Sequence, residues 1–260
     1  MNRFRYLRPL LLSGLILMFG SSRAAAYPLL QLDIGGGVYD NASETVFSTS
    51  LSFTLYAYLT PPPNTSATAL AKLLSTTYYM SAALVPKAPV AGGNYGSFLF
   101  NNQTVRATQD MVFGNPPLET YLGGAARDAG DLASHDIYDT YFKEFSFNFK
   151  STQRTAAYNT QDNAGTGPTL SPTGNMYFMA FTVDTRRLDP RYQVHFDMYD
   201  EVLKKGGDID VGNFAPFSKD AQSMRNTATV PEPGSLILLG SGLAALVARQ
   251  RRRRSPSTHP

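Results

Sequence analysis

The chain has 260 residues, of which 43% are hydrophobic, 12% aromatic and 17% charged, a composition typical of globular proteins and unlike that of disordered or fibrous chains. It contains no cysteine, which excludes disulfide scaffolds, thiolate metal sites and cysteine nucleophiles. The formal net charge is +3, but nine of the 23 basic residues are arginines at the two ends of the chain. The body between Tyr27 and Val230 contains the other 14 basic residues and 19 acidic ones, so it is mildly acidic. Nucleic acid is therefore not an expected partner.

Residues 1–26 predict a secretory signal peptide. Arg3, Arg5 and Arg8 form its charged start, and an apolar stretch runs from Leu10 to Gly20. A small-residue cleavage site follows, in which Ala24 and Ala26 occupy the two recognised positions of an A-x-A pattern. An uncleaved anchor is the alternative, but the apolar stretch is far shorter than the roughly 20 residues that span a bilayer. We therefore expect export and a mature chain that begins at Tyr27.

Residues 27–229 predict a single all-β domain. Apolar, aromatic and β-branched residues cluster or alternate in eight segments, separated by groups of glycine and proline that are typical of turns. The expected strands are Leu29–Ile34, Thr45–Leu59, Thr77–Leu84, Ser97–Phe100, Met111–Phe113, Tyr141–Phe149, Met176–Val183 and Tyr192–Tyr199. Two packed layers of antiparallel strands, a β-sandwich, accommodate this pattern best.

Two local patterns refine this prediction. Ala67–Leu74 contains good helix formers after Ser66, a possible N-cap, although a turn and a strand would also fit. Phe145, Phe147 and Phe149 occupy every second position of one expected strand, which puts three rings on one face. We expect this stripe to belong to the core, with a ligand platform as the less favoured alternative.

The best candidate for a metal site is acidic and weak. Asp208, Asp210 and Asn213 offer oxygen ligands of the kind that calcium takes, and further acids lie just upstream. The full calcium-loop motif is absent, so we favour a solvated polar loop over a calcium site. Calcium is the only cofactor that the sequence suggests. The upstream acids are Asp197, Asp200 and Glu201.

Catalytic motifs are not found in the body. His135 and His195 are its only histidines, and no G-x-S-x-G elbow accompanies them. Because a Ser-His-Asp triad is defined by geometry, a secreted hydrolase centred on either histidine stays open as a minor alternative. The 15 tyrosines allow another alternative, a module that stacks aromatic rings on the sugars of an exopolysaccharide.

The C-terminal segment has three parts in a fixed order. Pro231-Glu232-Pro233 comes first, then an apolar run from Ser235 to Ala248, then a basic cluster. As a helix the run is about 21 Å long at ~1.5 Å per residue, so it predicts a single short transmembrane helix. The basic cluster is expected to stay cytoplasmic, with the body on the exterior side. The cluster contains Arg249, Arg251, Arg252, Arg253 and Arg254, and residues 255–260 form an expected disordered tail.

This tail resembles the PEP-CTERM sorting signal of exopolysaccharide-producing Gram-negative bacteria. The matching features are the Pro231-Glu232-Pro233 motif, the short span and the arginine run within residues 230–254. The resemblance implies that an exosortase, an integral-membrane processing enzyme, is a partner that cuts near the motif. A plain C-terminal anchor would contain the same residues, but their order favours sorting.

The body resembles the choice-of-anchor N family of bacterial exported proteins. The resemblance rests on the segments 30–40, 53–59, 176–185 and 208–221. It implies an envelope protein without a known enzymatic activity. We therefore expect a non-enzymatic protein that is anchored transiently in the inner membrane and then reaches the cell surface or the extracellular matrix.

Overall fold

A computed structural model describes residues 29–90, 92–118, 132, 136–205 and 208–225. The predicted signal peptide with Ala24 and Ala26, the sorting segment 230–254 and the tail 255–260 lie outside the described residues, and so do the two expected terminal helices. None of the helices within the described residues is long and apolar enough to cross a bilayer.

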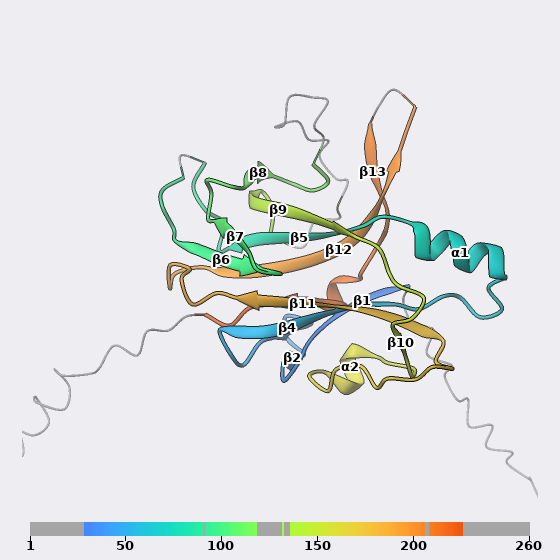
Figure 1. The fold of residues 1–260 in the computed structure, drawn as a ribbon. Coiled ribbons are helices and arrows are strands. Elements are labelled where there is room, and N and C mark those ends of the chain that lie inside the picture. Colours follow the sequence, from blue (N-terminus) through green and yellow to red (C-terminus); the bar gives the residue numbers. More distant parts are fainter. Residues whose placement is uncertain (1–28, 91, 119–131, 133–135, 206–207, 226–260) are drawn as a thin grey trace, which may run out of the picture.

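Two β-sheets form the body and face each other as a sandwich (Figure 1). The first sheet has six strands in the order β1-β4-β11-β6-β7, and β10 adds to β11. All its pairings are antiparallel, as the sequence predicts. Its strands are β1 (Leu30–Ile34), β4 (Ser52–Leu59), β6 (Ser97–Phe100), β7 (Gln103–Arg106), β10 (Arg154–Thr155) and β11 (Met176–Asp184).

The second sheet has eight strands in the order β2-β3-β14-β12-β5-β9-β8, and β13 adds to β12. One pair, β3 with β14, is parallel, which departs from the expected antiparallel arrangement because β14 returns from the far end of the domain to the edge of β3. The strands are β2 (Val38–Asp40), β3 (Thr45–Phe47), β5 (Tyr78–Val85), β8 (Val112–Gly114), β9 (Thr140–Phe147), β12 (Gln193–Leu203), β13 (Ile209–Phe214) and β14 (Asp220–Gln222).

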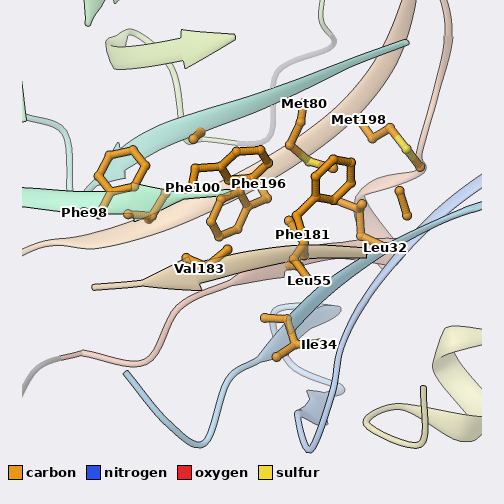
Figure 2. Close-up of a cluster of buried hydrophobic side chains, with 14 of the residues drawn as sticks. Leu32, Ile34, Leu55, Met80, Phe98, Phe100, Phe181, Val183, Phe196 and Met198 are labelled. Carbon is orange, nitrogen blue, oxygen red and sulfur yellow. The ribbon is translucent and has the colours of Figure 1, made fainter. Parts of the chain in front are cut away.

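Aromatic rings fill the space between the sheets. Figure 2 shows Phe100 and Phe181 of the first sheet beside Phe196 of the second. The predicted phenylalanine stripe joins them, because Phe145 stacks on Phe100 with ring centroids 4.1 Å apart and Phe147 meets Phe181 edge-on at 5.0 Å. The stripe is therefore part of the core, where such pairs add stability beyond the apolar area they bury.

Three helical segments accompany the sheets within the described residues. Helix α1 (Ala67–Ser75) is confirmed at the predicted place, and the Ser66 hydroxyl accepts a hydrogen bond from the Ala69 amide as its N-cap. The one-turn helix α2 (Thr160–Asn163) lies against the first sheet, and the 3₁₀ turn η2 (Phe217–Lys219) precedes β14. Neither of the last two was predicted, since each is too short for a periodic pattern.

Candidate functional site

Strand β12 divides its side chains between the core and the opposite face of the second sheet. Val194, Phe196 and Met198 point into the core, as the alternation of a strand requires. The intervening His195 and Asp197 lie on the outer face, yet they are just as inaccessible, with 1% and 4% of their surface exposed. A buried histidine and carboxylate therefore stand two residues apart on one strand.

The neighbouring strand completes this group. Because β14 pairs with β12 so that Gln222 lies opposite His195, it brings buried Asp220 beside the imidazole. His195 Nε2 is 3.5 Å from Asp197 Oδ1 and 3.4 Å from Asp220 Oδ2. On the other side of the ring, His195 Nδ1 is 3.1 Å from Gln222 Oε1. We call His195, Asp197 and Asp220 the β12–β14 triad.

The tyrosine that lies over the triad fixes one of its carboxylates. The Tyr138 hydroxyl donates a hydrogen bond of 2.7 Å to Asp197 Oδ2, and the Ser81 hydroxyl lies 2.8 Å from the same tyrosine oxygen. Both residues lie on the outer side of β5 and β12. Asp197 thus lies between the imidazole of His195 and the phenol of Tyr138, which donates to it.

Electrostatics favour positive charge at the imidazole. Burial by itself lowers the pKa of His195, but the charge and hydrogen bond of Asp197 and the charge of Asp220 outweigh it and raise the pKa to about 9. Within the described residues, this is the one group of three histidine or acidic side chains whose ligand atoms all lie within 4.8 Å of one another. The triad is thus chemically able to hold either a proton or a metal ion.

A second outer-face cluster lies further along β12. Glu144 Oε1 accepts hydrogen bonds from the Tyr199 hydroxyl and from the Leu118 amide. Burial raises the pKa of Glu144, and burial together with the charge of Glu144 raises the pKa of Glu201 to about 7. These two carboxyls share a poorly solvated region, so each makes ionisation of the other less favourable.

A hollow among the described residues lies elsewhere, at the end of the first sheet beside helix α1. It is a groove of about 860 Å³ walled by Pro61, Pro62 and Pro63 on one side and by Tyr177 on another. Arg154 is the only charged residue in its lining, and the guanidinium lies 5.6 Å from the centroid of the Tyr177 ring. The rest of the lining is partly apolar, with Leu29, Leu70, Ala157 and Met176, and partly polar, with hydroxyl and amide groups of Thr60, Asn64, Thr65, Thr173 and Asn175.

The predicted calcium ligands have different partners. Asp210 forms an ion pair of 2.6 Å with Lys204 across the β12–β13 hairpin. Asn213 donates hydrogen bonds of 2.6 and 2.8 Å to Asp200 from its backbone and side-chain amides. Asp208 lies between the two strands, just before β13. The structure thus uses Asp210 and Asn213 to fasten a hairpin, while calcium binding stays a prediction.

The upstream acids are separated by the folding of β12. Asp197 joins the triad, Asp200 binds Asn213, and Glu201 faces Glu144. The sequence held one usable signal for the triad, a histidine and an aspartate at alternate positions of an otherwise apolar strand. Nothing in the sequence pointed to Asp220, because it lies 25 residues from His195 on a short strand that was not predicted. His135, the other histidine of the body, lies outside the described residues.

The tyrosines proposed for sugar stacking are mostly inside the protein. None of the 12 tyrosines within the described residues reaches the exposed class, and six of them are buried. Tyr58 and Tyr158, for example, stack on each other at 4.5 Å beneath the loop that carries α2. A flat surface of exposed rings is therefore not found in the described part of the body.

Comparison with known proteins identifies one region. Residues 229–253 match the PEP-CTERM protein-sorting motif, which contains Pro231, Glu232, Pro233 and most of the basic cluster. No curated protein matches the chain. The motif supports an exported protein that is anchored transiently in the membrane and processed by an exosortase.

Proposed function

We propose that this protein is a non-enzymatic component of the cell surface or extracellular matrix, delivered by exosortase processing of its C-terminal tail. The observation that carries the proposal is the sorting motif at residues 229–253. Its body is the cargo, a β-sandwich with an aromatic core that resembles the choice-of-anchor N family in its sequence. The protein has no cysteine, so the stability of this exported domain comes from packing and buried hydrogen bonds and not from disulfides.

The intact mass of the protein tests this route. We expect the protein recovered from the medium or the outer surface of its host to begin at Tyr27 and to end near Pro231 or Glu232. Replacing Pro231, Glu232 and Pro233 by alanine is expected to leave the uncut chain in the inner membrane. Recovery of the wild-type chain with Arg249 to Pro260 still attached would instead identify an ordinary anchor.

The chemistry of the body supports a role other than catalysis. The Nε2 atom of His195 faces two carboxylates, and Nδ1 lies at a glutamine oxygen. A catalytic histidine needs one nitrogen within hydrogen-bond reach of the nucleophile. Any hydrolysis detected in the purified protein that disappears in His195→Gln or His135→Gln would contradict this assignment.

A second candidate function is binding of polysaccharide in the groove beside α1. Its combination of several hydroxyl and amide groups with one guanidinium is suited to a sugar chain that carries carboxylates. We expect the host's own exopolysaccharide to retain the protein on a column in low salt. Arg154→Gln is expected to weaken retention, and Arg186→Gln, on a distant exposed turn, to leave it unchanged.

A further inference from the structure

The position of the imidazole proton in the β12–β14 triad suits a cation beside His195 Nε2. Gln222 Oε1 can only accept a hydrogen bond, so the Nδ1 atom that faces it carries hydrogen. Nε2 then points its lone pair at two carboxylate oxygens, which are also acceptors. A second proton or a metal ion between these atoms would offset the repulsion among the three acceptors.

The spacing distinguishes these two cations. Charge-assisted N–H···O hydrogen bonds are about 2.7–2.9 Å long. In the triad the two nitrogen–oxygen distances are 3.5 and 3.4 Å. Two ligands that each lie about 2.1 Å from one tetrahedral ion are separated by about 3.4 Å. The observed distances therefore suit a shared ion better than a shared proton.

The ligand types narrow the choice of ion. One imidazole nitrogen and two carboxylate oxygens form a borderline set that zinc accepts, whereas calcium and magnesium prefer oxygen alone. Two of the three ligands also have an outer partner of the kind found at metal sites: Gln222 at the imidazole and Tyr138 at Asp197. We propose that His195, Asp197 and Asp220 bind one zinc ion, a function beyond surface delivery.

Burial and topology give this ion a structural role. All three side chains are buried, so a substrate could not reach the ion. The ion would bind as the domain folds. It would join the centre of the second sheet, β12, to β14, the strand whose parallel pair with β3 connects the two ends of the domain.

Metal binding to the mature protein tests the proposal. The protein is purified from its host without a polyhistidine tag, stripped with a chelator, and melted with zinc, calcium or no metal added. We expect one zinc per chain in the unstripped protein, and a Tm that rises by roughly 5 °C or more with excess zinc and not with calcium. Cobalt bound in place of zinc is expected to give the strong visible absorption of a tetrahedral site.

Variants connect the response to the triad. His195→Gln and Asp220→Asn are expected to abolish the zinc shift and the cobalt spectrum. Asp184→Asn, which removes a surface carboxylate bonded to Arg186, is the matched control and is expected to keep both. Because a triad variant could fail to fold, imidazole NMR of the wild type is decisive as well. Hydrogen on both nitrogens of His195 at pH 7, with no zinc retained and no zinc shift, would overturn the proposal.

Discussion

Several polar side chains on the outer faces of both sheets are buried. The alternation of apolar and polar residues along a strand predicts that such polar side chains are exposed to solvent. In β1 the apolar residues Leu30, Leu32 and Ile34 point into the core, and Gln31 and Asp33 alternate with them. Both polar residues have no exposed surface, because the loop around α2 covers them and bonds to them. The residue pattern thus identified the faces of the strand correctly but could not reveal a cover supplied by residues 125 or more positions away.

The hydrogen bonds around Asp33 predict that it is held as the neutral acid. The Tyr158 hydroxyl has one hydrogen to donate and lies 2.6 Å from both Asp33 Oδ2 and the Asn163 carbonyl oxygen. If the carbonyl receives that hydrogen, Asp33 must donate to the phenol. Burial raises the pKa of Asp33 and outweighs the hydrogen bonds from Tyr158 and Gly165 that lower it, in agreement with this direction.

Substitution of Asp33 distinguishes the neutral acid from the carboxylate. Asparagine reproduces the donor and the acceptor of a neutral acid, so we expect Asp33→Asn to preserve or raise the free energy of unfolding at pH 7. Asp33→Ala leaves the buried Gly165 amide without its acceptor and is expected to cost about 1–3 kcal/mol. Urea denaturation measures both. A loss with asparagine as large as with alanine would show that the carboxylate is needed.

Glu201 predicts a decrease of stability between mildly acidic and neutral pH. Its pKa is raised from 4.5 to about 7 by burial and by Glu144, so the folded state holds the proton more tightly than the unfolded state. Stability contributed by this proton is present below pH 4.5 and is lost as the pH rises toward 7. Glu201 is half-buried, and solvent screening reduces the effect. Glu201→Gln is expected to flatten this part of the Tm profile and to raise Tm at pH 7 by about 1–2 °C, whereas exposed Glu44→Gln leaves the profile unchanged.

At the scale of elements, turn signals decided which predictions succeeded. All eight predicted strand segments contain strands, but Thr45–Leu59 is two strands that belong to different sheets. Residues 48–51 carry the chain from β3 in the second sheet to β4 in the first, and serines and a threonine bridge this corner. The segment is rich in β-forming residues throughout, so its composition gave no reason to break it. Strands β2, β7, β10, β13 and β14 were missed because they are short or polar.

The loop that covers β1 depends on a glycine. Gly165 has φ +81°, and a Cβ atom there would lie 2.3 Å from the Gly37 carbonyl oxygen. The same residue donates to Asp33 and accepts a hydrogen bond of 2.8 Å from the Gly36 amide. Gly165→Ala therefore strains the backbone and displaces both contacts.

We expect Gly165→Ala to lower the free energy of unfolding by roughly 2 kcal/mol or more. Gly93→Ala is the matched control, because its Cβ would make only ordinary contacts, the nearest at 3.4 Å from Tyr95. Chemical denaturation of the two variants compares them directly. Equal stabilities would mean that the α2 loop shifts freely over β1.

At the scale of the molecule, the sandwich is closed before the sorting motif begins. Strand β14 ends at Gln222, the Ser223 hydroxyl accepts a hydrogen bond of 2.9 Å from Val194, and the Met224 amide donates one of 2.7 Å to Ser48. These contacts fasten the end of the domain several residues ahead of Pro231. A cut near the motif therefore removes none of the strands that the structure describes and leaves the core between them closed.

The processed and unprocessed forms are accordingly expected to share one stability. The tail can then be released without unfolding the body of the protein. Delivery of a folded domain would require this. We expect the form released from the host and the alanine-motif variant extracted in detergent to melt within about 2 °C of each other, a difference of at most about 1 kcal/mol for a domain of this size. Ser48→Ala, which removes the acceptor of the Met224 amide, is expected to lower both melting temperatures equally. A released form that melts clearly lower would mean that residues beyond Met224 belong to the folded domain, and that cleavage itself loosens the cargo.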